Sequence, residues 1–304
     1  MKNKKNQICK ITQVSIVVVN YNAGSLLSVN VKVALMQARQ VVVVDNASSD
    51  SSLELLESTY AGNARLKIVR NNSNLGFSAG CNIGMLHSTE PYILYLNPDC
   101  VLAPDTLHHM LATMHSNPNA GMVGGLLLGQ DGMEQGGGRR AVPTPWRSFV
   151  RAFGLTRLAS RWPRLFDDFN LHGQPLPVSP VPVEAISGAL MLVRRVAQDD
   201  VGAWDEGYFL HCEDLDLCMR FRKKKWDILF DPAASAIHAQ GTCSKDRPIF
   251  VEWHKHKGMV RFYRKFFRHQ YPGILMWIVM IGVWARFILV AAIKSHQYHA
   301  PRIA

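Results

Sequence analysis

The stretch Val14-Ser-Ile-Val-Val-Val19, which ends at Asn20-Tyr-Asn22, decides the fold class of this chain. A continuous run of β-branched residues is typical of a strand covered on both faces, as strands are in a parallel sheet. Val41-Val-Val-Val44 repeats the pattern and ends at Asp45. We therefore expect an open parallel sheet with ligand-binding residues beyond the carboxyl ends of its strands.

Further helical and strand patterns alternate through the first hundred residues. They predict helices at 25–40, 52–60 and 79–87 and strands at 66–69 and 92–96. Ser49, Asp50 and Ser51 are capping candidates for the second of these helices. The alternation predicts an α/β fold with a doubly wound, mostly parallel sheet.

The second half of the chain has a different texture. Residues 129–175 are rich in Gly, Pro, Arg and Trp, which predicts a flexible, irregular excursion, either disordered or a lid over a site. Residues 183–193 predict a strand that returns to the core. We expect one catalytic domain over 1–245, with halves at 14–124 and 125–245, and a helical region at 246–304.

Composition restricts the partners and the compartment. A formal net charge of +11 over 304 residues indicates an anionic partner, such as nucleic acid, phosphorylated metabolites or an acidic membrane surface. The six cysteines form no C-x-x-C pair, which favours reduced thiols in a cytosol. The apolar run Ile16–Val19 is too short for a signal peptide, so we expect a cytoplasmic protein.

Asn97-Pro98-Asp99 follows the strand predicted at 92–96. Pro98 ends that strand and fixes the backbone, so the two flanking side chains are held at the sheet edge. A hard divalent cation binds carboxylate oxygen and completes its shell with water or substrate phosphates. Asp99 is therefore a candidate metal ligand, and the alternative is an ordinary strand-ending turn. Asp45 likewise has two possible roles: its carboxylate binds a base or ribose, or it is an ordinary helix cap or turn residue.

Three acids, Glu213, Asp214 and Asp216, stand in a row at the start of a predicted helix. They could form a charged first turn that is stabilised by the helix dipole. Alternatively, one of them could be a general base at the edge of the core. His238 stands at a predicted strand end and is either structural or a metal ligand. The chain contains neither G-x-G-x-x-G nor a P-loop, so no dinucleotide fold or P-loop is predicted.

Seven motifs in this order resemble the family 2 glycosyltransferases of GT-A fold, and in particular their bacterial rhamnosyltransferase-like branch. They are Ser15-Ile-Val-Val-Val-Asn-Tyr-Asn22, Val44-Asp-Asn-Ala-Ser-Ser-Asp50, Asn74-Leu-Gly-Phe77, Leu96-Asn-Pro-Asp99, Ser187-Gly-Ala-Leu190, Phe209-Leu-His-Cys-Glu-Asp-Leu-Asp216 and His238-Ala-Gln-Gly241. The resemblance covers residues 14–265. It implies a nucleotide-sugar half at 14–124 and an acceptor half at 125–245.

The resemblance also implies roles for individual residues. The nucleotide-sugar would contact Asn20, Tyr21, Asp45, Asn74, Gly76 and Asn97. Asp99 takes the place of the last acid of the family's D-x-D motif and would hold Mg²⁺ or Mn²⁺, with His238 as a further metal ligand. Asn97 replaces the first acid of that motif. Asp214 would be the base that deprotonates the acceptor hydroxyl, with the catalytic partner Glu213 beside it.

The reaction implied is inverting sugar transfer from a nucleotide-diphosphate donor to a polyprenyl-diphosphate-linked saccharide, in bacterial cell-surface polysaccharide synthesis. The preferred donor is dTDP-L-rhamnose. Three alternatives stay open: another UDP- or GDP-sugar, a nucleotidyltransferase of similar sheet, and a membrane-bound scaffold that has lost activity. A nucleotidyltransferase would need a Gly-rich loop with Arg and Lys after Val19, and this chain has none.

The C-terminal region suits a membrane. Residues 247–270 interleave aromatic and basic side chains, as a basic helix at an anionic membrane does, although a packed helix with a solvated face has the same pattern. Residues 273–293 are apolar apart from Arg286 and are long enough to span a bilayer. We expect attachment to the cytoplasmic face of the bacterial inner membrane; a packed helix or homodimer contact is the alternative. Without a helix-turn-helix, zinc or RNP pattern, no nucleic-acid partner is expected.

Overall fold

The computed structural model describes residues 12–166, 168–239 and 247–299. Its strands are β1 (Thr12–Asn20), β2 (Ala38–Asp45), β3 (Leu66–Arg70), β4 (Tyr92–Leu96), β5 (Cys100–Leu102), β6 (Ala120–Leu128), β7 (Arg139–Arg140), β8 (Val181–Pro182), β9 (Ala185–Ile186), β10 (Leu190–Arg194) and β11 (Asp227–His238). Its helices are α1 (Leu26–Gln37), α2 (Ser52–Tyr60), α3 (Phe77–Leu86), α4 (Thr106–Ser116), α5 (Pro145–Ala152), α6 (Pro163–Phe166), α7 (Arg195–Val201), α8 (Glu213–Lys223), α9 (Pro248–Phe267) and α10 (Gly273–His299). Two 3₁₀ helices, η1 (Leu155–Ser160) and η2 (Leu171–Gly173), complete the described elements.

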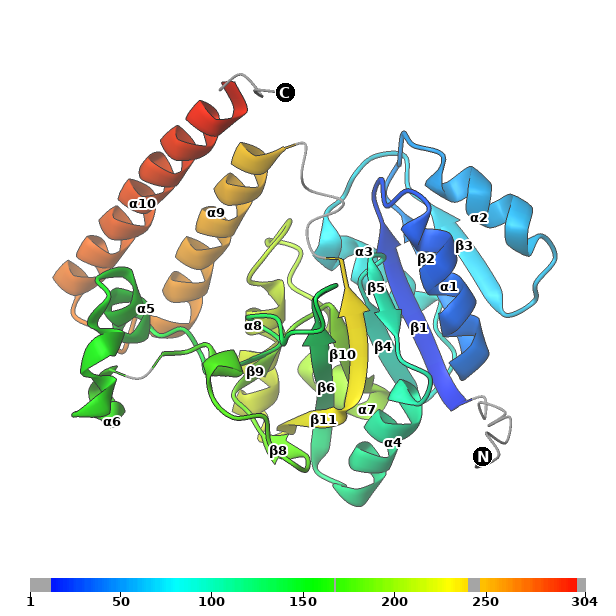
Figure 1. Cartoon of the computed structure of the whole chain (residues 1–304), viewed down its shortest axis with the longest axis horizontal. Coiled ribbons are helices and arrows are strands. Elements are labelled where there is room, and N and C mark those ends of the chain that lie inside the picture. Colours follow the sequence, from blue (N-terminus) through cyan, green and yellow to red (C-terminus); the bar gives the residue numbers. More distant parts are fainter. Residues whose placement is uncertain (1–11, 167, 240–246, 300–304) are drawn as a thin grey trace.

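A nine-stranded mixed sheet forms the centre of the molecule (Figure 1). Its order is β3-β2-β1-β4-β10-β6-β11-β5, and β8 pairs with β11 beside this path. Within the described strands of this sheet, β5, β8 and β10 run opposite to the rest. The predicted doubly wound and mostly parallel sheet is therefore confirmed. The short strands β7 and β9 form a separate pair.

Both faces of the sheet are covered, as the β-branched runs predict. One face packs Ile16 and Val18 of β1 against helices α1, α2 and α4. The other packs Val17 and Val19 against α3, α8 and the aromatic residues of α9. Burial of both sides of the strand explains why residues 16–19 are continuously apolar and do not alternate with polar residues.

Three sequence predictions need correction. Helix α1 ends at Gln37, not at residue 40, because Ala38 to Gln40 pair with β1 instead. No glycine or proline marks that end in the sequence, so only strand pairing decides it. The strand predicted at 183–193 is interrupted between β9 and β10 by Ser187-Gly-Ala189. Residues 129–175 are not wholly irregular, because they contain α5, η1, α6 and η2; their flexibility stays a prediction.

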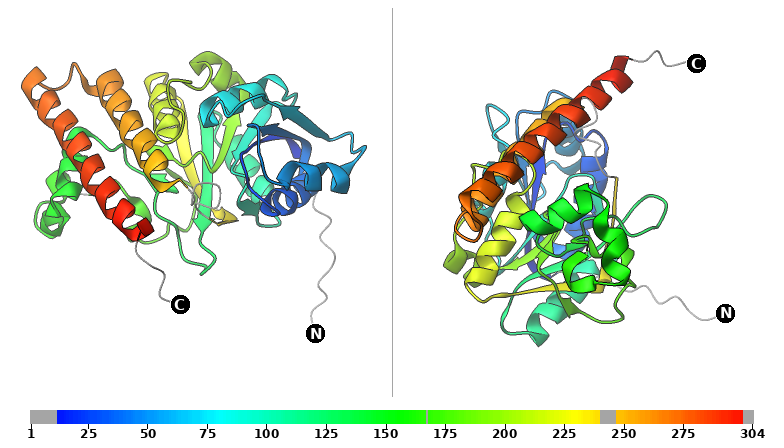
Figure 2. Two further views of the ribbon diagram at one scale, coloured as in Figure 1. Left: turned by 90° about the horizontal axis from the view of Figure 1, so that it is seen from above. Right: turned by 90° about the vertical axis from the view of Figure 1, so that its left-hand side faces the viewer.

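The C-terminal helices α9 and α10 form an antiparallel pair at the end of the molecule farthest from β3 (Figures 1 and 2). Phe262, Tyr263 and Phe266 of α9 are buried in the apolar cluster that also contains residues of α3 and α8. Helix α10 packs on α9 through a stripe that includes Met276 and Val283. Of the described helices, α10 alone is long and apolar enough to cross a membrane, and its most apolar window is only 11% buried.

The predicted reduced cysteines agree with the structure where it describes them. Cys81, Cys100, Cys212 and Cys218 are free thiols. Cys9 and Cys243 lie outside the described residues, as do Gln240 and Gly241 of the last sequence motif. The division into domains at residues 124 and 245 stays a prediction.

Candidate active site

The predicted site residues meet along one edge of the sheet. Asn20, Asp45 and Asn97 stand at or just after the carboxyl ends of the neighbouring parallel strands β1, β2 and β4. Strand β10 runs antiparallel to β4, so its first residue, Leu190, pairs with Leu96. This reversal brings the loop 187–189 to the same edge, and the backbone N–H of Asn97 donates to the carbonyl of Ala189 at 3.1 Å.

A polar cluster links the ends of β1 and β2. The buried Asn20 side chain donates from Nδ2 to Asp45 Oδ1 at 2.7 Å and lies within 3.0 Å of Ser48 Oγ. Asp45 also accepts from the backbone N–H of Ser48 at 3.1 Å and from its hydroxyl at 2.6 Å. Such buried, mutually bonded groups have fixed positions. Asn20 and Asp45 therefore hold this corner in shape, and Tyr21 follows it half-exposed.

Asp99 and His238 form a second corner of the edge. Strand β5 begins directly after Asp99 and pairs with β11 in the register Cys100 to His238. This pairing places Asp99 Oδ1 3.2 Å from His238 Nε2, with both side chains buried. The Asn97 amide Nδ2 lies 3.4 Å from the same His238 nitrogen. Residues far apart in sequence thus share one small polar site.

Gln135 fixes the imidazole of His238. Its side chain accepts from His238 Nδ1 at 2.9 Å and donates to the His238 carbonyl at 2.7 Å. In a neutral ring this bond puts the proton on Nδ1 and leaves a lone pair on Nε2, which faces Asp99. Fixing the outer nitrogen in this way is how proteins orient histidine ligands of metal ions.

The chemistry of this corner fits a divalent cation. Two acceptor atoms 3.2 Å apart, Asp99 Oδ1 and His238 Nε2, repel each other unless a proton or cation lies beside both. The described residues contain no cluster of three or more His, Cys, Asp or Glu side chains that could hold an ion alone. A cation here would therefore need oxygen atoms from a substrate diphosphate or water, as Mg²⁺ usually does.

A strained turn precedes Glu213 and Asp214 and places them near the same edge of the sheet. His211 and Cys212 both have positive φ values, 68° and 71°, immediately before Glu213 and Asp214 at the start of α8. Non-glycine residues in this region are uncommon and persist only where their surroundings hold them. Gly258 of α9 packs closely against this turn, because a Cβ atom at position 258 would lie 2.7 Å from the His211 carbonyl oxygen.

Gly76 holds the other side of this turn. It has a φ of 88°, and a Cβ atom at this position would lie 2.6 Å from the carbonyl oxygen of Phe209. The next residue, Phe77, donates its backbone N–H to that carbonyl at 2.8 Å. Asn74 shapes the loop by accepting from the backbone N–H of Gly76 at 3.0 Å. In this structure the motif 74–77 contacts the acidic turn.

We expect Gly76→Ala to lower both stability and turnover. The substitution combines unfavourable φ, at about 1–3 kcal/mol, with a clash against Phe209. Gly62→Ala is the matched control, because its φ is 74° but no atom lies within 4 Å of the added Cβ. Denaturant unfolding and turnover rates would measure both variants. Equal losses in the two variants would show that contact with Phe209 is unimportant.

Asp214 is held by three donors. Arg140 of β7 forms an ion pair with Asp214 Oδ2, and Gly188 donates its backbone N–H to that oxygen at 3.3 Å. Leu215 donates its backbone N–H to the other oxygen, Oδ1, at 2.7 Å. Gly188 neighbours Ala189, which bonds to Asn97. The loop 187–189 therefore connects the carboxylate of Asp214 to the corner that holds Asp99.

Glu213 has different surroundings from its neighbour Asp214. Burial, together with the nearby charge of Asp214, raises the pKa of Glu213 to about 8. Its Oε2 atom is buried and has no hydrogen-bond partner among the residues that the structure describes. The raised pKa favours the protonated form of Glu213, which cannot accept a proton. Two acids held in unlike environments divide roles in this way, which leaves Asp214 as the candidate base.

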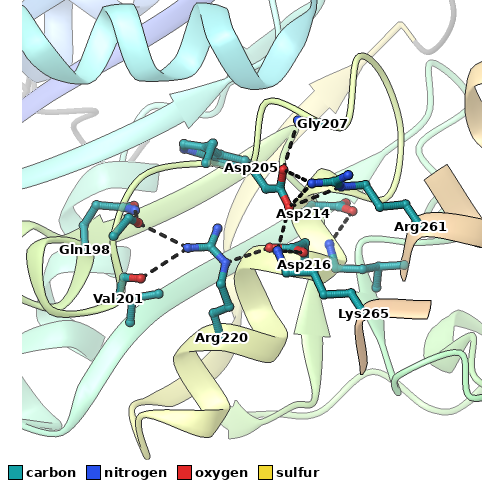
Figure 3. Close-up of polar contacts among 12 residues, drawn as sticks. Gln198, Val201, Asp205, Gly207, Asp214, Asp216, Arg220, Arg261 and Lys265 are labelled. Atoms are coloured by element: carbon teal, nitrogen blue, oxygen red, sulfur yellow. Dashed lines mark hydrogen bonds and ion pairs between the residues drawn. The ribbon is translucent and has the colours of Figure 1, made fainter. Parts of the chain in front are cut away.

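The third acid of the row has a structural contact instead. Asp216 is fully buried and pairs with Arg220 and with Lys265 of α9, each at 2.6 Å (Figure 3). Lys265 also pairs with Asp205, which accepts from Arg261 of α9 (Figure 3). These bonds lower the pKa of Asp205 to about 2 against the opposing effect of its burial. The network ties α9 to the loop and helix that carry Asp214.

Sequence reasoning missed Gln135, Arg140 and Ser48. Gln135 and Arg140 lie in the excursion that was expected to be irregular, and each contacts a predicted site residue from there. The signal for them is the tract Gln135-Gly-Gly-Gly-Arg-Arg140, in which polar side chains flank flexible glycines. Ser48 was visible only as part of the polar sequence after β2.

Comparison with known proteins gives one family and several relatives. Residues 15–168 match the family model of glycosyl transferase family 2. The chain is 28% identical over 237 residues to the N-acetylglucosaminyl-diphospho-decaprenol L-rhamnosyltransferase of Mycobacterium tuberculosis, covering 73% of this chain and 75% of the relative. It is 26% identical over 228 residues to rhamnosyltransferase WbbL of Escherichia coli, covering 65% and 82%.

A solved structure shares the fold. The mannosyltransferase PcManGT from Pyrobaculum calidifontis, in complex with GDP-Man and Mn²⁺, superposes with a TM-score of 0.56 at 16% identity. The match covers 96% of this chain and 77% of that chain. Together with the mixed sheet described above, it confirms the predicted GT-A type of α/β fold.

Proposed function

The chain belongs to glycosyl transferase family 2, in its rhamnosyltransferase-like branch, and from this premise we propose that it transfers a sugar with inversion from a nucleotide-diphosphate donor to a lipid-linked saccharide. The preferred donor is dTDP-L-rhamnose. The acceptor is a polyprenyl-diphosphate-linked saccharide of bacterial cell-surface polysaccharide synthesis. The names of both relatives support rhamnose as the sugar, and the name of the Mycobacterium tuberculosis relative also supports a polyprenyl-diphosphate-linked acceptor.

One observation carries the proposal. Adjacent residues of a single loop, Gly188 and Ala189, bond to Asp214 and to the Asn97-Pro-Asp99 turn. A carboxylate that can accept a proton is thereby fixed beside a corner suited to a diphosphate and its cation. Glycosyl transfer from a sugar nucleotide needs these two groups together, because the acceptor hydroxyl loses a proton as the diphosphate leaves.

The residues of the chain perform the following steps in this proposal. Asn20, Tyr21 and Asp45 bind the nucleoside, and the loop containing Asn74 and Gly76 borders the sugar. Asp214 accepts the proton of the acceptor hydroxyl while that oxygen bonds to the anomeric carbon and the bond from this carbon to the diphosphate breaks. Direct displacement inverts the anomeric carbon. The raised pKa of Glu213 favours its protonated form, which does not compete for the proton.

Asp99 and His238 would hold Mg²⁺ or Mn²⁺, which when bound neutralises charge on the leaving diphosphate. Asn97 would contact the donor. Arg140 forms an ion pair with Asp214 and would hold the carboxylate of the base in its orientation.

We place the enzyme at the cytoplasmic face of the inner membrane, attached through α10. The outward side chains of α10 are large and apolar, and Ile274, Trp277 and Ile288 are each more than two-thirds exposed, at 79%, 72% and 67%. Because α10 packs lengthwise on α9, it suits a position in the plane of the bilayer interface better than one across the bilayer. A lipid-linked acceptor in that leaflet would then lie beside the catalytic domain.

A donor screen tests the proposed function. The full chain is incubated with dTDP-, UDP- and GDP-sugars, Mg²⁺ or Mn²⁺, and a bacterial membrane lipid extract, and release of nucleoside diphosphate is measured. We expect release that depends on both the metal and the lipid extract, and fastest with dTDP-L-rhamnose. Faster release with a UDP- or GDP-sugar would replace the donor. No release with any donor would favour an inactive scaffold.

A further inference from the structure

The segment 145–166, here called the arginine-aromatic segment, has no part in the chemistry described above. It contains α5, η1 and α6 and carries five arginines and no acidic residue. Its large apolar side chains point outward and are exposed: Trp146, Phe149, Phe153, Leu158, Trp162 and Leu165. A cluster of exposed aromatic groups on a soluble surface marks an interaction site.

Three of the five arginines in the segment have no acidic partner among the described residues. Arg147 pairs with Glu184 and Arg151 pairs with Asp168. Arg157, Arg161 and Arg164 are exposed and form no ion pair among the described residues. Three unpaired guanidinium groups interleaved with aromatic rings match an anionic bilayer, which offers phosphates at the surface and an apolar region just beneath it.

The position of the segment also points to a bilayer. Tyr263 of α9 donates its hydroxyl to Ser148 of α5 at 2.7 Å, which ties the segment to the C-terminal helix pair. The segment and α10 lie at the same end of the molecule, and both face the viewer in the right-hand view of Figure 2. The two apolar surfaces are therefore placed to meet one membrane.

We propose that the arginine-aromatic segment is a second bilayer contact besides α10. Arg157, Arg161 and Arg164 bind anionic lipid headgroups, while Phe153 and Trp162 enter the boundary between headgroups and acyl chains. The proposal rests on the proposed function only in placing the chain at a bilayer.

The contact would fix the catalytic domain relative to the membrane. The backbone N–H of Val142 and the guanidinium of Arg147 both bond to Glu184, at 2.6 and 2.8 Å. This joint connects the segment to Arg140, which pairs with Asp214. A bilayer bound by the segment is thus held at a set place relative to the candidate base, where a lipid-linked acceptor would be presented.

The first test measures binding of the full chain to vesicles of phosphatidylcholine, with and without phosphatidylglycerol. We expect the triple variant R157Q/R161Q/R164Q to bind the anionic vesicles roughly 100-fold more weakly, at about fivefold per arginine. The triple variant K32Q/K67Q/R222Q is the matched control, because it removes three exposed cations from α1, β3 and α8. Equal binding by the two variants would overturn the proposal.

The second test holds even if α10 alone keeps the protein on vesicles. Amide hydrogen exchange of the wild-type chain should slow across residues 153–166 when anionic vesicles are added. Protection of α10 without protection of 153–166 would overturn the proposal. The proposal would also be overturned if the triple arginine variant lost binding to a single-stranded oligonucleotide but still bound vesicles as the wild-type chain does. A dimer dissociated by F153S/W162S, with vesicle binding unchanged, would assign the surface to a second copy of the chain.

These outcomes are separate from those of the donor screen. A chain that releases no nucleoside diphosphate but shows the protection would refute the proposed function alone. A chain that transfers sugar but leaves 153–166 unprotected would refute the second bilayer contact alone.

Discussion

Replacing Asp214 with asparagine should lower kcat for sugar transfer by about 10²- to 10⁴-fold, the usual contribution of a general base. Asparagine keeps the size of the side chain and cannot accept the proton of the acceptor hydroxyl. KM for the donor should change little, because the residues proposed to bind the donor do not include Asp214. Initial rates at varied donor and acceptor concentrations would separate the two constants.

Asp216→Asn is the control for this substitution. Both changes remove a carboxylate from an ion pair in the first turns of α8, and breaking such a buried pair costs about 3–5 kcal/mol. Both variants should therefore unfold at lower denaturant concentration. Only Asp214→Asn should lose kcat under conditions where both are folded. A similar loss in Asp216→Asn would mean that α8 packing, not proton transfer, sets the rate.

Replacing Asp99 with alanine should lower turnover by about 10³-fold or more, because removing a carboxylate that holds the charge-neutralising cation forfeits several kcal/mol of stabilisation. Asn97→Ala should lower turnover only about fivefold, since an amide contributes a neutral contact worth about 1 kcal/mol. Binding of Mn²⁺ in the presence of nucleoside diphosphate, followed by electron paramagnetic resonance, gives a readout independent of catalysis. We expect it to fall in Asp99→Ala and persist in Asn97→Ala.

Asp105→Ala supplies the control for removal of a nearby carboxylate. Asp105 precedes α4 and makes no side-chain capping hydrogen bond, so its loss should leave both turnover and Mn²⁺ binding unchanged. Equal effects of Asp99→Ala and Asn97→Ala on Mn²⁺ binding would contradict the assignment of the metal to Asp99.

Much of the sheet could be predicted because its strands are covered on both faces. Val14–Val19 and Val41–Val44 admit few other structures, since a solvated strand alternates and a helix of this length would rarely be all β-branched. The polar residues that end these strands followed directly, because the carboxyl ends of parallel strands share one edge. Asn20, Asp45 and Asp99 were found on this basis.

Boundaries that depend on pairing could not be predicted. Ala38 to Gln40 have no local feature that excludes helix, and they are strand because β1 lies beside them. Likewise, the break at 187–189 reflects the antiparallel approach of β10 to β4, which places this loop at the sheet edge. Local composition contains no information about either neighbour.

The sequence by itself determined the fold class, the family resemblance and the acids that could act. Each of these depends on residue type and order along the chain. The partners of the site residues could be known only from the tertiary structure: Arg140 pairs with Asp214, Gln135 bonds to His238, and Lys265 and Arg220 pair with Asp216. The physical reason is that charge pairing and burial depend on distance in space, and three acids adjacent in sequence point in different directions once α8 forms.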